Sequence, residues 1–139
     1  MAATMTGGCA CGAVRYECSG DPVFSGNCYC RDCQLSSGTA MASVLGVPKA
    51  AVKILKGEGD VRYFEVTADS GYKISRGFCP TCGTPLFSLL AALPDVMGIK
   101  AASLDDPAHF TPGMSLFTSS APAWAPFVEN LPKFPKMPA

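Results

Sequence analysis

Short runs in which apolar and polar residues alternate recur along the chain, and few windows hold a helical period. Residues 13–18, Ala-Val-Arg-Tyr-Glu-Cys, predict a strand that ends at the turn residues 19–22. Residues 61–66 and 72–75 predict a hairpin across Asp69-Ser70-Gly71. Further strands are predicted at residues 40–47, 51–56, 85–90 and 96–104. The pattern therefore predicts a mainly β protein.

Two segments depart from this strand pattern. Residues 31–37 predict a single short helix, whereas residues 86–93 fit a strand or a helix, because a short apolar run has no decisive period. From Ala121 onward the chain carries five of its 12 prolines and predicts irregular backbone. We expect one domain over residues 1–139, with a core at 1–120 and a proline-rich tail at 121–139 packed on it.

The charges are balanced and scattered. Eleven basic and eleven acidic residues give a formal net charge of +0, and no run of like charges is present. This argues against nucleic-acid and anionic-membrane partners, which require clustered Lys and Arg. The longest apolar stretch, residues 89–93, is far shorter than the ~20 residues of a membrane span. The N-terminus has neither the basic nor the apolar part of a signal peptide, so a cytoplasmic location is expected.

Eight cysteines in a chain of 139 residues are the main chemical feature. In a reducing compartment they favour metal binding or catalysis over disulfides. The two residues between Cys79 and Cys82 let both sulfurs reach one tetrahedral ion at about 2.3 Å, and Gly83 permits the tight turn that follows. Seven of the eight cysteines fall into three groups: Cys9 and Cys11; Cys28, Cys30 and Cys33; Cys79 and Cys82.

Seven sulfur ligands do not divide into two sets of four. Four thiolates close a structural zinc site, whereas three leave a fourth position free, as in catalytic zinc sites. The group at Cys28, Cys30 and Cys33 lies within six residues and is the natural three-ligand site. Spacing alone leaves another partition open, in which this group recruits Cys9 or Cys11. Either way, the sequence predicts Zn²⁺ as the cofactor, with two ions per chain, one structural and one catalytic.

Three segments carry a resemblance to a known family. They are residues 7–16, GGCACGAVRY; residues 28–33, CYCRDC, followed by Ser37-Gly38; and residues 77–86, GFCPTCGTPL. Together they resemble the glutathione-dependent formaldehyde-activating enzymes, a family that includes centromere-protein-V-like proteins. Ala123-Trp124 and residues 130–134 are similar to the usual ending of that family.

The resemblance implies a fold and a ligand partition. The fold is expected to be Mss4-like, with packed antiparallel sheets that carry zinc-binding knuckles. Structural zinc is expected on Cys9, Cys11, Cys79 and Cys82. Catalytic zinc is expected on Cys28, Cys30 and Cys33.

The expected activity follows from three thiolates on zinc. Such a centre has a net local charge of −1 and is soft enough to prefer sulfur as a fourth ligand, and a coordinated thiol loses its proton. Together with the family resemblance, this chemistry predicts a carbon–sulfur lyase acting on an adduct of an aldehyde with glutathione or another small thiol; the S-(hydroxymethyl)glutathione synthase type is what the resemblance implies. The alternative is a non-catalytic, zinc-stabilised module that binds a small thiol or a protein partner.

Five other residues have less specific interpretations. Cys18 lies outside every group and is expected to be a small buried apolar residue. His109, the single histidine, is expected to be a partly buried turn residue. Arg31 and Asp32, between the ligands, form either a solvated pair or a set of groups that tunes the zinc. Trp124 is expected to line a pocket under the tail or to anchor the tail to the core.

Overall fold

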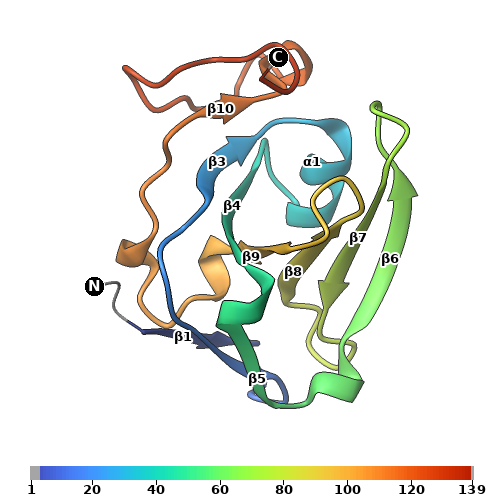
Figure 1. Ribbon diagram of the computed structural model, residues 1–139. Coiled ribbons are helices and arrows are strands. Elements are labelled where there is room, and N and C mark those ends of the chain that lie inside the picture. The colour runs from blue at the N-terminus through green and yellow to red at the C-terminus, as the bar shows by residue number, and fades with distance from the viewer. Residues whose placement is uncertain (1–3, 139) are drawn as a thin grey trace.

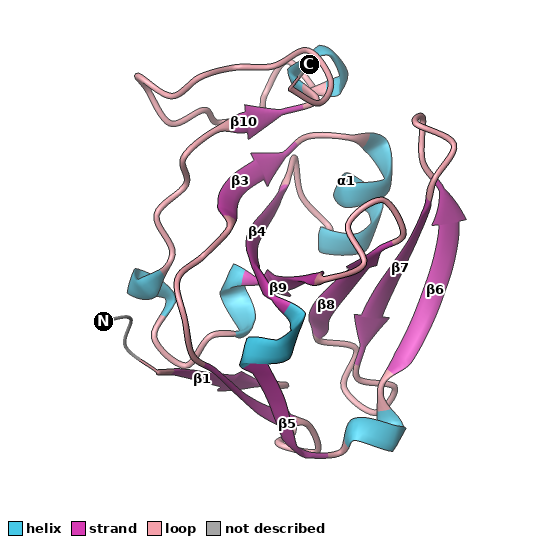
Figure 2. Cartoon of the chain, viewed as in Figure 1, coloured by secondary structure: helices cyan, strands magenta, loops and turns pink. Residues whose placement is uncertain are grey.

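The structure, a computed structural model, describes residues 4–138, and its strands form two sheets (Figure 1; Figure 2). The smaller sheet has the order β1–β2–β5, formed by Met5–Gly8, Arg15–Cys18 and Val52–Lys56. The larger sheet has the order β10–β3–β4–β9–β8–β7–β6. Its strands are β3 Phe24–Cys28, β4 Ala42–Pro48, β6 Arg62–Thr67, β7 Lys73–Phe78, β8 Pro85–Leu90, β9 Val96–Lys100 and β10 Ser115–Leu116. The predicted mainly β architecture is confirmed.

The helical segments are short. The α-helix α1 covers Arg31–Ser37, as predicted, and Gly38 ends it in the left-handed conformation with a φ of 78°. Its N-cap is Cys30, whose sulfur accepts a hydrogen bond from the backbone N–H of Cys33. Single 3₁₀ turns cover Lys49–Ala51, Glu58–Asp60, Ala101–Ser103, Pro107–His109 and Thr118–Ser120. Within residues 4–138, every helix is too short or too polar to cross a membrane.

The hairpin predicted between residues 61 and 75 is present. Strands β6 and β7 pair antiparallel, with Phe64 opposite Arg76, and Gly71 in the connecting turn has a φ of 87°. Residues 86–90, which fitted either type of element, form strand β8 between β7 and β9. A strand is favoured there because Phe87 pairs with Gly77 on one side and with Ile99 on the other.

Three strands have no counterpart in the sequence prediction, namely β1, β3 and β10. Strand β3 contains Gly26 and Asn27, residues that disfavour a strand by propensity. It is held between β4 and β10 in the large sheet, so tertiary pairing overrides that propensity. The strand predicted at residues 96–104 ends at Lys100, where a 3₁₀ turn begins.

The two faces of the large sheet have different roles. On one face Leu45, Ile99 and Phe87 stand opposite one another on β4, β9 and β8 and are buried against Tyr16 of the small sheet. The Tyr16 and Phe87 rings meet edge to face, with centroids 5.2 Å apart. Side chains alternate along a strand, so Lys100, next to Ile99, belongs to the other face. This second face supports the candidate site.

Cys18 and the tail complete the fold. Cys18 is 0% exposed in the core, which confirms its expected role as a small buried residue. The tail contacts the segment between β3 and α1 through Phe127, whose ring stacks on Tyr29 with centroids 4.5 Å apart. Tyr29 also donates a hydrogen bond of 2.6 Å from its hydroxyl to the carbonyl oxygen of Pro126. The expectation for Trp124 is wrong: its side chain is 69% exposed, and Phe127 anchors the tail instead.

Candidate metal centres

Four cysteines from distant parts of the chain meet at one point. The sulfurs of Cys9, Cys11, Cys79 and Cys82 all lie within 4.8 Å of one another. Cys9 Sγ is 3.6 Å from Cys11 Sγ, which is 3.8 Å from Cys79 Sγ. Four sulfurs that each lie about 2.3 Å from a tetrahedral ion are about 3.8 Å apart, so the spacing fits zinc. This four-cysteine centre joins the loop after β1 to the loop between β7 and β8.

The two loops of the four-cysteine centre turn in the same way. The N–H of Gly12 donates to the carbonyl oxygen of Cys9 at 3.1 Å, and that of Gly83 donates to Cys79 at 2.7 Å. Both glycines have a φ of 79°, a conformation in which a Cβ would add strain. The turn predicted after Cys82 is therefore confirmed, and Gly12 supplies its counterpart in the first loop.

Hydrogen bonds to sulfur favour the thiolate form of two of these cysteines, Cys9 and Cys82. The Val14 N–H donates to Cys9 Sγ at 3.3 Å, and the Thr84 hydroxyl lies 3.1 Å from Cys82 Sγ. The hydroxyl and backbone N–H of Thr84 lower the pKa of Cys82 to about 5. At Cys9 burial acts to raise the pKa, but the Val14 N–H and the Cys11 and Cys79 thiols outweigh it and the net shift is downward.

The remaining three grouped cysteines form a second, local centre. The sulfurs of Cys28, Cys30 and Cys33 lie within 4.8 Å of one another. Cys28 ends β3, Cys30 is the N-cap of α1, and Cys33 lies in the first turn of that helix. The Cys33 N–H donates to Cys30 Sγ at 3.3 Å, so the helix start itself orients two of the sulfurs.

Negative charge in the three-cysteine centre gathers on one sulfur. Hydrogen bonds from the Cys28 and Cys30 thiols, with a smaller effect of the Lys100 and Arg76 charges, lower the pKa of Cys33 to about 2. Cys28 has the opposite shift, because its hydrogen bonds to Cys30 and Cys33 and its burial raise its pKa. A divalent ion bound by all three sulfurs would favour three thiolates. Three soft sulfur donors at this spacing are a donor set that fits zinc.

A cavity of about 390 Å³ adjoins the three-cysteine centre. Its size is within the usual range of small-molecule pockets. The second face of the large sheet contributes Val44 and Ser88 to its lining. Cys28, Cys30 and Cys33 also line the cavity, together with Asp69 of the β6–β7 turn and Met137 of the tail. None of the cysteines of the four-cysteine centre lines this cavity.

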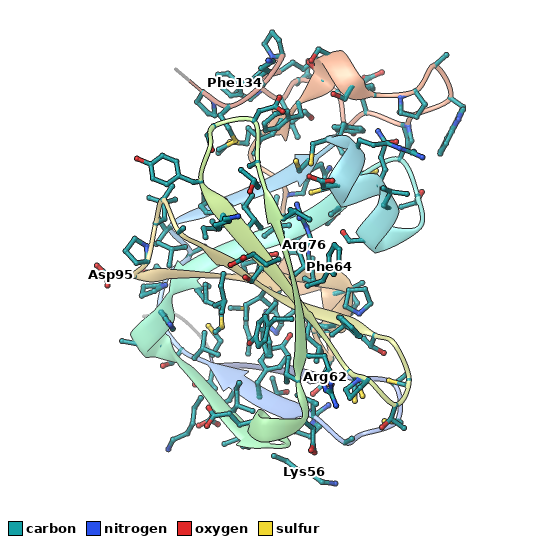
Figure 3. All side chains as sticks on the ribbon, turned by 90° about the vertical axis from the view of Figure 1, so that its right-hand side faces the viewer. Lys56, Arg62, Phe64, Arg76, Asp95 and Phe134 are labelled. Carbon is teal, nitrogen blue, oxygen red and sulfur yellow. The ribbon has the colours of Figure 1, made fainter. Side chains whose placement is uncertain are left out.

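Two basic residues face the cavity from neighbouring strands. Arg76 lies on β7 (Figure 3). It donates from Nη2 to Cys33 Sγ at 3.6 Å. Lys100 on β9 is 6% exposed, and its Nζ has no hydrogen-bond partner among residues 4–138. Burial lowers the pKa of Lys100, while the nearby Cys33 thiolate opposes that shift.

Comparisons with known proteins identify the family and the fold. The family description "Glutathione-dependent formaldehyde-activating enzyme" matches residues 4–120. The chain belongs to this family. In fold it is similar to the crystal structure of a Rhodobacter sphaeroides protein from a structural genomics programme, with a TM-score of 0.60 and 21% identity over 76% of this chain and 94% of the other. The family resemblance inferred from the three cysteine motifs is confirmed, whereas the Mss4-like label stays a prediction.

The other candidate residues differ in whether they line the cavity. Arg31 and Asp32 line the cavity, and Arg31 donates to the side chain of Gln34 at 3.1 Å rather than to a sulfur. His109 lies in a 3₁₀ turn outside the lining of the cavity, and its Nε2 is 3.9 Å from Oδ2 of Asp106. Sequence reasoning missed Arg76 and Lys100. The available signal was weak. Lys100 is the one charged residue of the strand VMGIK, whereas Arg76 lies in a strand that also contains Lys73 and Ser75.

Proposed function

We propose that this protein is a zinc-dependent enzyme of the carbon–sulfur lyase type, acting on the adduct of an aldehyde with glutathione or a similar thiol. The observation that carries this is the contrast between the two centres. The four-cysteine centre has a complete ligand set and no share in the cavity, whereas the three-cysteine centre has one ligand fewer and lines the cavity. An incomplete protein ligand set facing a pocket is the arrangement of catalytic zinc.

The two centres would have different roles. Cys9, Cys11, Cys79 and Cys82 would hold a structural ion, and Cys28, Cys30 and Cys33 would hold the catalytic one. Zinc bound by those three cysteines would supply a Lewis acid that favours the deprotonated form of a substrate thiol. The family description, which names both glutathione and formaldehyde, supports a thiol and an aldehyde as the reactants.

The chain itself would orient the sulfurs and limit access of water. The Cys33 N–H and the Arg76 guanidinium each donate to a sulfur of the three-cysteine centre, which restricts how those ligands can turn. Val44, Leu90 and Leu116 give the cavity apolar walls. Apolar walls displace water that would otherwise compete with the thiol for the aldehyde carbon.

The reaction needs no third reactant. In the synthetic direction an electron pair on the thiol sulfur forms a bond to the aldehyde carbon, and the π pair of the carbonyl moves to its oxygen. That oxygen takes up the proton that the thiol released, so the product is an S-hydroxyalkyl thioether. The reverse direction breaks the carbon–sulfur bond and returns the proton to sulfur. No atom is oxidised or reduced.

The test measures the rate of formaldehyde–glutathione condensation in the presence of zinc-loaded protein. NMR exchange between free glutathione and its adduct gives this rate. The wild type should exceed the spontaneous rate, and Cys30→Ser should return to it. Cys18→Ser is the matched control, because it removes a sulfur outside both centres, and it should retain activity provided that it folds. Binding of glutathione by wild-type protein without any rate above the spontaneous one would favour the alternative, a thiol-binding module.

A further inference from the structure

Two buried or half-buried cations face the three-cysteine centre without a carboxylate partner. The ion pairs within residues 4–138 are Arg15–Asp105, His109–Asp106 and Lys136–Asp69, and neither Arg76 nor Lys100 takes part in one. Asp32 lines the same cavity but lies beyond ion-pair distance of both. A buried ammonium group without a counter-charge is costly, so its compensating charge must lie in the site. Asp69 is already paired with Lys136, and the anionic group in direct contact with Arg76 is the Cys33 sulfur.

The sheet holds both cations rigidly toward these sulfurs. Arg76 is paired with Ser88 of β8 and Lys100 with Val44 of β4, so each lies within the ladder of the large sheet rather than in a loop. Arg76 contacts Cys33 Sγ directly. The Nε of Arg76 and the Nζ of Lys100 are both buried and lack hydrogen-bond partners among residues 4–138. Arg76 Nε and Lys100 Nζ are therefore two hydrogen-bond donors that a ligand of the three-cysteine centre can use.

The charges add up to a preference for an anion. Three thiolates and one Zn²⁺ have a net charge of −1, and Arg76 and Lys100 change this to +1. Of the other charged side chains that line the cavity, Arg31 offsets Asp32, and Asp69 is paired with Lys136. A thiolate as the fourth ligand brings the total to zero, whereas a neutral ligand leaves it at +1. In a site of low dielectric constant such a difference strongly favours the anion.

We propose that Lys100 and Arg76 are positioning residues that make the three-cysteine centre select a ligand that arrives as an anion. This inference rests on the proposed function and deepens it: the substrate is bound as a thiolate, and neutral ligands such as water or a thioether are disfavoured. Lys100 acts through its positive charge, and Arg76 acts through its positive charge and its contact with Cys33 Sγ.

The test uses cobalt(II)-loaded protein, because thiolate ligands give cobalt a charge-transfer absorption in the near ultraviolet. The probe is 2-mercaptoethanol, which has no other charged group, titrated into wild type, Lys100→Met and the control Lys53→Met. Lys53 is exposed on β5, in the other sheet, so its substitution removes one positive charge remote from the cavity. We expect Lys100→Met to bind the thiol on the order of tenfold more weakly, and Lys53→Met to bind it as wild type does.

Two further measurements make the result specific. Imidazole, a neutral ligand, should bind wild type and Lys100→Met equally, which a general distortion of the site would not allow. Arg76→Met should weaken thiol binding in the same direction and serves as the second variant if Lys100→Met fails to fold. Two cobalt ions per chain should remain in each variant, and loss of the second ion from both would overturn the inference.

The two proposals fail in different ways. Equal thiol affinity in wild type, Lys100→Met and Arg76→Met overturns the cation pair but leaves the proposed function intact. Absence of any thiol-dependent absorption change in wild type overturns the proposed function, and the cation pair with it.

Discussion

The two cysteine centres contain the same ligand chemistry but are built in opposite ways. The four-cysteine centre draws its sulfurs from positions 9 to 82, so an ion there would close a long loop between the two sheets. The three-cysteine centre lies within residues 28–33 and is shaped by one strand end and one helix start. The first can therefore hold the fold together, whereas the second has little effect on topology and is free to serve the cavity.

Breaking the four-cysteine centre should give the largest effect. Cys79→Ser removes a ligand that is 0% exposed and lies between the two sheets. Structural zinc contributes on the order of 10 kcal/mol of apparent binding energy, comparable with the whole stability of a domain, so the variant should unfold or aggregate. Circular dichroism melting and elemental analysis check this. A folded Cys79→Ser protein with wild-type melting would show that this centre is not structural.

Breaking the three-cysteine centre should remove one metal ion without unfolding the protein. Cys30→Ser should remain folded, bind one zinc fewer than the two expected for wild type, and lose the condensation activity. The reason is that its ligands share one short segment, so no distant parts of the chain depend on them. Serine can still act as an N-cap for α1, which protects the helix. Collapse of this variant to the same degree as Cys79→Ser would contradict the comparison.

The tail offers a smaller perturbation that is confined to the side of the three-cysteine centre. Phe127→Ala removes the ring that stacks on Tyr29, between Cys28 and Cys30, and should cost about 1–3 kcal/mol in unfolding free energy. Because Met137 of the same tail lines the cavity, the KM for the thiol should also rise. Trp124→Ala is the matched control, since that side chain is 69% exposed and should have little effect on either quantity. Urea unfolding and steady-state kinetics measure both.

The smallest predicted effect concerns acid stability on the side of the four-cysteine centre. Asp105 accepts from Arg15 and from the Thr6 hydroxyl, and these contacts lower its pKa to about 2 from an ordinary value of 3.8. The stabilisation is present above about pH 4 and is lost as the pH falls toward 2. Since both side chains are more than a third exposed, Asp105→Asn should cost less than about 1 kcal/mol at neutral pH.

Urea unfolding of wild type and Asp105→Asn at several pH values tests the contribution of the Arg15–Asp105 contact. The difference between the two proteins should shrink below about pH 4, because the wild-type carboxylate is then becoming protonated. Comparing the two proteins cancels the acid sensitivity of the cysteine centres, which both share. A difference that stays constant down to pH 2 would show that the Asp105 contacts do not depend on its charge.

The sequence by itself determined the features that depend on a few adjacent residues. The short helix at residues 31–37, the hairpin around Gly71 and the tight turn at Gly83 follow from local backbone preferences, and all three are present. The cysteine motifs likewise indicated the family, which the match over residues 4–120 confirms. These features need no knowledge of what packs against them.

Tertiary structure decided everything that depends on partners far away in the chain. Spacing left open which cysteines group together, and the fold brings Cys79 and Cys82 to the first pair, away from Cys28. Strand β3 exists because β4 and β10 pair with it, although Gly26 and Asn27 disfavour a strand. Lys100 faces the cavity because strand register places it on the second face of the large sheet. A one-residue change of register exchanges the faces, so no local pattern could identify Lys100 as part of the site.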